Sequence, residues 1–212
     1  MAKCCAVATV VVSPDPNAVY GLVHDPLHIA FLQQRCRIYG SPDGSQAAGT
    51  KAPARLRLAL EEMTVGVTKG FLRLQAASDM KRREPGDRRW RLSLQRHHRL
   101  QVFQDLWERN YIVTFGSKFG ADFLIYKDNP KHTHAVALIT VKEYEEEFER
   151  VDIVSFCRVA KMIKKVFLFA SVRDSAENKS DGEQKDGSQV SEEAVKSVVY
   201  ISLTHALLVS RR

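Results

Sequence analysis

No apolar run in this chain of 212 residues approaches the roughly 20 consecutive residues that a membrane-spanning helix needs. The longest run near the start, Ala6 to Val12, is also too short for a secretory signal sequence. These absences predict a soluble, intracellular protein that is not embedded in a membrane.

Cysteine is scarce as well. The four cysteines form no CxxC pair and have no histidine at metal-ligand spacing; they are Cys4, Cys5, Cys36 and Cys157. Adjacent Cys4 and Cys5 cannot form an ordinary structural disulfide with each other, so we expect all four to be reduced. The sequence predicts no zinc site, no other metal site and no cofactor.

The composition is that of a globular protein, with 44% hydrophobic and 27% charged residues, which excludes a wholly disordered or fibrous chain. The net charge of +7 favours an anionic partner such as nucleic acid or a membrane surface. Most of this excess lies in residues 81–99, where Arg88, Arg89 and Arg91 are candidate RNA contacts. His97 and His98 lie in the same stretch without a partner motif, and we expect both at the surface.

Residues 1–76 predict a small mixed α/β domain. Strand, helix and loop patterns follow one another there: a strand at Ala6–Val12, a helix within 24–35 that begins with Asp25 as N-cap and Pro26 in the first turn, a loop at 41–54, and a strand, a short helix and a second strand within Leu56–Leu74. Residues 77–91 are polar, contain Pro85 and Gly86, and read as a basic linker.

Residues 92–212 predict a second α/β domain with a central mixed sheet flanked by helices. Its elements are a helix from Ser93 to a C-cap at Asn110, strands at Tyr111–Phe115, Asp122–Tyr126 and His134–Val141, a helix at Val151–Lys165, and strands at Val166–Val172 and Val198–Leu203. A polar, acidic loop at 173–197 interrupts this domain before its last strand.

Three segments of this second domain carry a family resemblance: GSKFGADFLIY (116–126), CRVAKMIKKVFLF (157–169) and VVYISL (198–203). They resemble the catalytic domain of the tRNA-splicing endonuclease family, and within it the eukaryotic subunit that cuts the 3′ splice site. The resemblance covers about residues 92–205 and implies a restriction-endonuclease-like fold. It implies cleavage of precursor tRNA without a metal ion, which releases the intron and leaves a 2′,3′-cyclic phosphate and a 5′-hydroxyl.

The family's tyrosine, histidine and lysine triad maps by motif onto Tyr126, His134 and Lys165. Tyr126 closes the GxKFGxDFxxY strand, and His134 follows eight residues later, before the next strand. In the family pattern the lysine is the last residue of the helix, directly before an apolar strand. This position selects Lys165 over Lys164. His132 remains an alternative for the histidine.

The chemistry of RNA cleavage needs these residue types. The 2′-hydroxyl is the nucleophile, so the site needs a base, an acid for the 5′-oxygen and a cation beside the phosphorane. We expect Tyr126 to take the proton, His134 to act as the acid and Lys165 to stabilise the transition state. A phenol ionises only near pH 10 in water, so a tyrosine base needs a nearby cation, whereas imidazole titrates near neutrality.

A metal-dependent nuclease of similar fold is the rival interpretation. Asp122 could be its first Mg²⁺ ligand, but the third strand reads Thr140-Val141-Lys142 where a second acidic ligand is required. We therefore expect Asp122 to be a structural hydrogen-bonding residue.

The resemblance also implies partners. Relatives work as four-subunit assemblies in which dimers form by pairing C-terminal strands, and the corresponding strand here is Val198–Leu203. The resemblance therefore implies a heterotetramer with other splicing endonuclease subunits in the nucleus. The loop at 173–197 either inserts into a neighbouring subunit or is a solvated insertion. The alternative function is a non-catalytic structural or RNA-binding subunit of the same complex.

Overall fold

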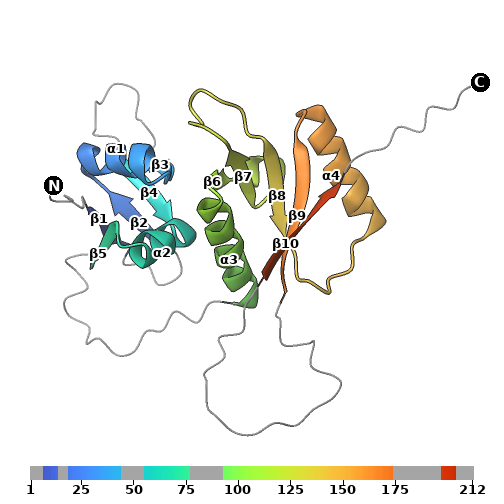
Figure 1. Cartoon of the computed structure of the whole chain (residues 1–212), viewed down its shortest axis with the longest axis horizontal. Helices are drawn as coiled ribbons and strands as arrows, with labels where there is room; N and C mark the ends of the chain where they lie inside the picture. Colours follow the sequence, from blue (N-terminus) through green and yellow to red (C-terminus); the bar gives the residue numbers. More distant parts are fainter. Residues whose placement is uncertain (1–6, 14–18, 44–54, 77–92, 174–196, 204–212) are drawn as a thin grey trace, which may run out of the picture.

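The structure is a computed structural model that describes residues 7–13, 19–43, 55–76, 93–173 and 197–203. These residues form two mixed five-stranded sheets, each with helices packed against it, as the sequence predicts (Figure 1). The proposed linker at 77–91, the RNA-contact candidates within it, Cys4, Cys5 and nearly all of the acidic loop lie outside the described residues.

The amino-terminal sheet has the strand order β3-β4-β2-β1-β5. Its strands are β1 (Ala8–Val12), β2 (Tyr20–Val23), β3 (Ser41–Asp43), β4 (Arg55–Ala59) and β5 (Leu72–Ala76). Its helices are α1 (Pro26–Arg35) and α2 (Leu60–Thr68). Only the β1–β5 pair is parallel, and the β4–α2–β5 order confirms the strand, helix and strand predicted within Leu56–Leu74.

Local sequence signals explain α1, but two strands were missed. Asp25 caps α1 by accepting a hydrogen bond from the Leu27 amide at 2.8 Å, and Pro26 begins the helix, as predicted. Strand β2 is too short to show a clear pattern. The predicted loop at 41–54 is wrong at its start, where Ser41–Asp43 pairs with β4, because a proline-containing edge strand has no alternation to reveal it.

The carboxy-terminal sheet has the order β10-β9-β8-β7-β6, with only β8 and β9 parallel. Its strands are β6 (Ile112–Phe115), β7 (Phe123–Tyr126), β8 (Ala137–Val141), β9 (Val166–Arg173) and β10 (Ser197–Leu203). Its helices are α3 (Leu94–Glu108), the 3₁₀ turn η2 (Ser117–Phe119) and α4 (Arg150–Met162).

Helices α3 and α4 cover opposite faces of this sheet, because successive strand residues point to opposite sides. Residues of one parity pack with Val102, Phe103 and Leu106 of α3; these are Phe123, Ile125, Ala137, Ile139, Val141, Ala170 and Val172. The other parity packs with Ala160 of α4; these are Leu124, Leu138, Phe167 and Phe169. The same alternation determines which face of the sheet Tyr126 of β7 occupies.

The ends of α3 follow the sequence closely. The Ser93 side chain caps the helix by accepting a hydrogen bond from the Arg96 amide at 3.4 Å, as predicted. The predicted C-cap is wrong by one residue, since Arg109 is the cap and Asn110 adopts the left-handed backbone that follows it. Asparagine tolerates that conformation better than most residues, which explains the offset.

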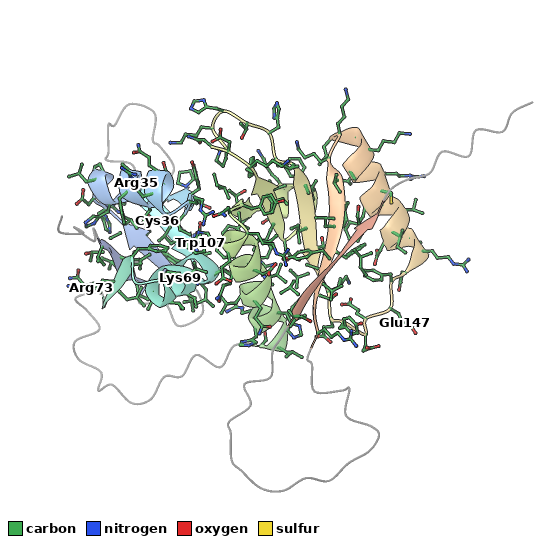
Figure 2. The ribbon with its side chains drawn as sticks, in the orientation of Figure 1. Arg35, Cys36, Lys69, Arg73, Trp107 and Glu147 are labelled. Atoms are coloured by element: carbon green, nitrogen blue, oxygen red, sulfur yellow. The ribbon has the colours of Figure 1, made fainter. Side chains whose placement is uncertain are left out.

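The two sheets meet along α3, and Trp107 lies at the junction (Figure 2). Its indole Nε1 donates to the Cys36 carbonyl oxygen at 2.9 Å, and its ring packs against Phe71. Arg37 lies over the same ring and donates to the Asn110 side chain at 2.7 Å. Burial raises the pKa of the Cys36 thiol to about 11, with Arg37 opposing it.

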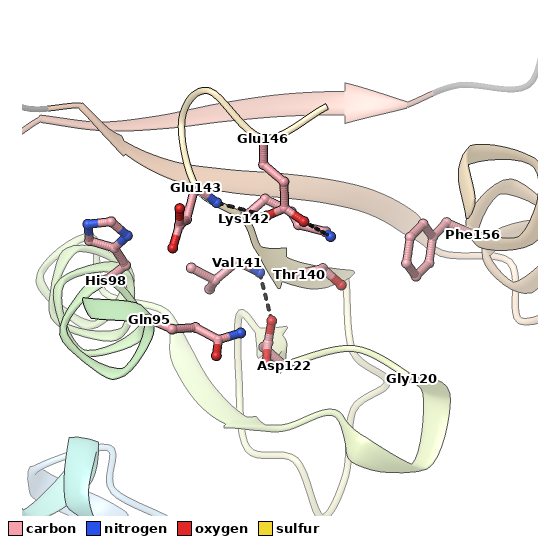
Figure 3. Close-up of a pocket in the computed structure, with 10 residues that line it drawn as sticks. All are labelled: Gln95, His98, Gly120, Asp122, Thr140, Val141, Lys142, Glu143, Glu146 and Phe156. Carbon is pink, nitrogen blue, oxygen red and sulfur yellow. Dashed lines mark hydrogen bonds and ion pairs between the residues drawn. The ribbon is translucent and has the colours of Figure 1, made fainter. Parts of the chain in front are cut away.

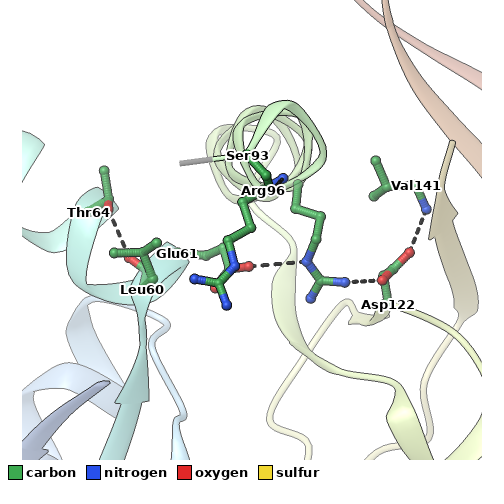
Figure 4. A network of polar contacts seen from close by, with 8 residues as sticks. Leu60, Glu61, Thr64, Ser93, Arg96, Asp122 and Val141 are labelled. Carbon is green, nitrogen blue, oxygen red and sulfur yellow. Dashed lines mark hydrogen bonds and ion pairs between the residues drawn. The ribbon is translucent and has the colours of Figure 1, made fainter. Parts of the chain in front are cut away.

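A polar network forms a second connection at the start of α3 (Figure 4). Arg99 donates through Nε to Glu61 of α2 at 3.3 Å and through Nη1 to Asp122, which precedes β7. Asp122 accepts a further bond from the Val141 amide at 2.7 Å. One guanidinium therefore links both halves of the described structure.

None of the helices in the described ranges combines the length and the apolar character that crossing a membrane requires. Within the same ranges, Cys36 and Cys157 are both free thiols, in agreement with the expectation for these two residues.

Candidate active site

The three residues predicted from the sequence come from three neighbouring strand junctions of the carboxy-terminal sheet. Tyr126 is the last residue of β7, His134 lies just before β8, and Lys165 immediately precedes β9. Strand β7 runs antiparallel to β8, and β8 runs parallel to β9. The end of β7 therefore lies beside the starts of β8 and β9, and all three residues fall at the same end of the sheet.

Lys165 is held by the way α4 ends. Its amide donates to the Ala160 carbonyl at 3.0 Å, and the Lys164 amide donates to Lys161 at 3.2 Å. This pair of bonds is a Schellman motif, which turns the chain from α4 into β9. The half-buried Lys165 side chain then donates from Nζ to the carbonyl oxygen of Ala135 at 2.7 Å, next to His134.

A short loop precedes His134, and hydrogen bonds to Asn129 hold this loop together. The Asn129 carbonyl oxygen accepts bonds from the amides of His132 and Thr133, both at 3.0 Å. Its side-chain oxygen accepts from the Lys131 amide at 3.0 Å. Both His132 and His134 are exposed, so either imidazole can meet a large substrate.

The loop that contains Asn129 and His132 also contacts the amino-terminal half of the structure. Lys131 Nζ donates to the Gln33 side chain of α1 at 3.2 Å. Tyr39 lies near the same loop: burial raises the pKa of its phenol, and the Asp128 charge raises it further. These interactions connect the segment that carries His134 to the amino-terminal half of the described structure.

Tyr126 lies on the face of the sheet that α4 covers. Its ring is half-buried and packs against a small apolar cluster formed by Ala121, Leu124, Ala135, Leu138, Ala160, Phe167 and Phe169. Ala135 and Ala160 belong to the segments that bind Lys165. The tyrosine and the lysine are therefore supported by the same packed region, and an aromatic anchored this way has little rotational freedom.

Asp122 lies at the opposite end of the sheet and is a structural residue, as predicted. It lines a polar pocket of about 540 Å³ together with His98, Thr140, Lys142 and Glu143, among others (Figure 3). Its two carboxylate oxygens are bonded by Arg99 and by the Val141 amide. Among the described residues, no group of three or more His, Cys, Asp or Glu is arranged to hold a metal ion.

The sequence analysis did not predict the burial of His98 or the contacts of Arg99, both on α3. His98 is buried, with 6% of its surface exposed, so the expectation of a surface histidine is wrong, whereas His97 is exposed as predicted. His98 precedes the buried Val102 and Leu106 by one and two helical turns, and this spacing is the signal that was available. The role of Arg99 had no local signal, because its partners are distant in sequence.

The comparisons with known proteins match the part of the chain that contains these three residues. The family of the tRNA intron endonuclease catalytic C-terminal domain matches residues 97–180. The tRNA-splicing endonuclease of Hyperthermus butylicus is 36% identical over 70 residues, which cover 33% of this chain and 39% of that relative. The tRNA-splicing endonuclease of Methanopyrus kandleri is 34% identical over 76 residues, which cover 36% of this chain and 42% of that relative.

The tRNA-splicing endonuclease subunit Sen34 of Mus musculus is 33% identical over 73 residues, which cover 34% of this chain and 23% of that protein. The chain thus spans about two fifths of the length of the first two relatives. The matching family domain contains Tyr126, His134 and Lys165. Residues 97–180 therefore match the catalytic domain of tRNA intron endonucleases, and this part of the chain is similar to tRNA-splicing endonucleases.

Proposed function

We propose that this chain is the catalytic subunit that cleaves precursor tRNA at the 3′ splice site, without a metal ion, and leaves 2′,3′-cyclic phosphate and 5′-hydroxyl ends. The observation that carries this proposal is the gathering of Tyr126, His134 and Lys165 at one end of the sheet. The Lys165 bond to Ala135 supports it further, because it fixes a cation beside the His134 backbone.

Each residue then has a role that its position supports. Tyr126 accepts the proton of the attacking 2′-hydroxyl. Lys165 stabilises the charge that develops on the phosphorane. His134 protonates the departing 5′-oxygen, and its exposed position suits a group that must reach a leaving strand.

The proposal includes an assembly. Strand β10 is an edge strand of the described sheet, paired on one side with β9. An edge strand offers unpaired backbone groups to a partner, so its free side pairs with another splicing endonuclease subunit in a heterotetramer. In this proposal the complex acts in the nucleus on precursor tRNA.

The test is cleavage of precursor tRNA by the assembled enzyme in excess EDTA, followed by mapping of both ends at each cut. Cleavage should persist in EDTA, and the 3′ boundary should carry the stated end groups. Loss of cutting on chelation would contradict the metal-free mechanism, and different end groups would contradict the use of the 2′-hydroxyl.

Variants of the site residues test their catalytic roles and show which intron boundary this subunit cuts. His134→Ala should lower the cleavage rate about 10²–10⁴-fold, whereas His132→Ala, the matched control on the same loop, should cut normally. The double variant Tyr126→Phe plus His134→Ala should still bind precursor tRNA and leave the 3′ boundary uncut. Loss of only the 5′ cut would assign the subunit to the other boundary, and normal cutting would make it a non-catalytic subunit.

A further inference from the structure

Lys164 occupies an unusual backbone position at the end of α4. The helix ends at Met162 with Ile163 as its C-cap, so Lys164 is the next residue, at the position that reverses the chain. Its φ angle is 53°, in the left-handed region. Glycine most often fills this place in a Schellman motif, because a side chain there crowds the backbone.

A lysine at this position therefore needs a reason other than the turn. Its side chain is exposed, and among the residues that the structure describes it enters no ion pair. Backbone conformations that are costly for the residue present are concentrated at functional sites. The charge, rather than the fold, is what this lysine adds.

Lys164 is also part of a group of cations. Lys161 lies three residues earlier, in the last turn of α4, is exposed, and is likewise absent from the ion pairs of the described ranges. Between them, Met162 is 83% exposed. A single lysine suffices to offset the helix dipole at this end, so the second free charge and the exposed apolar side chain remain to be explained.

We propose that Lys161 and Lys164 bind phosphate groups of a single-stranded RNA segment next to the bond cleaved at Tyr126, His134 and Lys165. This inference rests on the proposed function. In this proposal Lys165 meets the scissile phosphate, and the adjacent Lys164 together with Lys161 in the last turn of α4 meets the neighbouring phosphates. Contacts of this kind hold the strand in register without reading its bases, and the Met162 side chain offers an apolar surface to an unstacked base.

The test measures binding by the assembled enzyme of a precursor tRNA with a 2′-deoxy nucleotide at the scissile position, which cannot be cut. Lys164→Ala and Lys161→Ala should each weaken binding several-fold. Each should also reduce the slope of log K against log salt by about 0.7, the value for one phosphate contact on a single strand. Lys164→Arg should restore both quantities, and Lys118→Ala, at the opposite end of the sheet, should change neither.

A second variant separates RNA binding from folding. Lys164→Gly removes the same charge but suits the left-handed backbone, so its Tm should exceed that of Lys164→Ala by about 2–4 °C. Both variants should nevertheless bind RNA equally weakly. If RNA affinity instead followed Tm, or if the salt slope stayed unchanged in both variants, the proposal would be wrong.

Two further measurements, of the assembly and of wild-type cleavage, distinguish a failure of this proposal from a failure of the proposed function. Dissociation of the assembly on size-exclusion chromatography, with the salt slope unchanged, would assign Lys161 and Lys164 to a protein contact and overturn the proposal. Failure of the wild-type enzyme to cut precursor tRNA would refute the proposed function itself. A wild-type enzyme that cuts, with Lys164 variants that bind and respond to salt normally, would refute only the phosphate contact.

Discussion

The Lys165 ammonium donates a hydrogen bond to the Ala135 carbonyl oxygen at 2.7 Å and thereby joins the end of α4 to the residue that follows His134. The two residues are 30 positions apart in the sequence. The bond leaves the ammonium with further donors, because a lysine carries three N–H groups. One side chain can therefore hold the loop and still meet a phosphate.

Lys165→Ala should lower the cleavage rate constant about 10²–10³-fold, as expected when a donor to transition-state charge is removed. The affinity for uncut precursor tRNA should change far less. Lys165→Arg keeps the charge and should retain part of the activity. Single-turnover cleavage with saturating enzyme measures these effects, and a wild-type rate in Lys165→Ala would remove this residue from the mechanism.

If His134 is the catalytic acid, Asn129 should act as a positioning residue, because its hydrogen bonds hold the loop that leads to His134. Asn129→Ala removes the acceptor for the Lys131 amide and should lower kcat severalfold, with little change in KM. Asn129→Asp keeps that acceptor and should restore kcat. Equal losses in both variants would mean that the side-chain bond does not organise the loop.

Arg99 should stabilise the fold by satisfying two carboxylates. Arg99→Ala leaves Glu61 and Asp122 without their shared partner and should lower the free energy of unfolding by about 1–3 kcal/mol. The matched control is Arg96→Ala, since Arg96 is exposed one turn earlier on α3. Urea denaturation of both variants measures the difference, and equal stability would show that the network contributes nothing.

Glu62 should make stability depend on pH. It is buried, and desolvation raises the pKa of its carboxyl to about 7, although bonds from the amides of Ala59 and Gly40 oppose the shift. A raised pKa means that the folded state holds the proton more tightly than the unfolded chain. The free energy of unfolding should therefore be highest below the unfolded value, near pH 4.5, and fall as the pH rises toward 7.

The measurement is urea denaturation between pH 4 and 8, in steps of about one unit. The slope contributed by Glu62 cannot exceed about 1.4 kcal/mol per pH unit. Glu62→Gln should remove this contribution, whereas Glu143→Gln, at an exposed position, should preserve it. A pH profile that is identical in wild type and Glu62→Gln would mean that Glu62 does not titrate in this range.

Much of the fold follows from short-range patterns. Strands β1 and β9 are apolar runs rich in β-branched or aromatic residues, and the caps at Asp25 and Ser93 use side chains that bond the first turn directly. The triad candidates were found because a motif fixes their order and spacing, and their catalytic roles stay a prediction. The domain boundary within residues 77–91 also stays a prediction.

Other features depend on partners that are far apart in the chain. Strand β3 exists because Ser41–Asp43 meets β4, and His98 is buried because the start of α3 packs against the rest of the structure. Ser41–Asp43 carries no pattern that shows its pairing, and the only local signal for the burial of His98 is its helical spacing to Val102 and Leu106. Whether an edge strand pairs and which side of a helix is buried depend on segments that are distant in the sequence.

The sequence by itself determined the resemblance to tRNA-splicing endonucleases, most of the element types and the identity of Tyr126, His134 and Lys165 as candidates, because residue type and spacing are local properties. Only the tertiary structure decided that β8 and β9 run parallel, which brings those three positions to one end of the sheet. It also decided that Arg99 joins Glu61 to Asp122 and that Lys165 reaches Ala135. The physical reason is that hydrogen bonds and packing form between groups that folding brings together, whatever their separation along the chain.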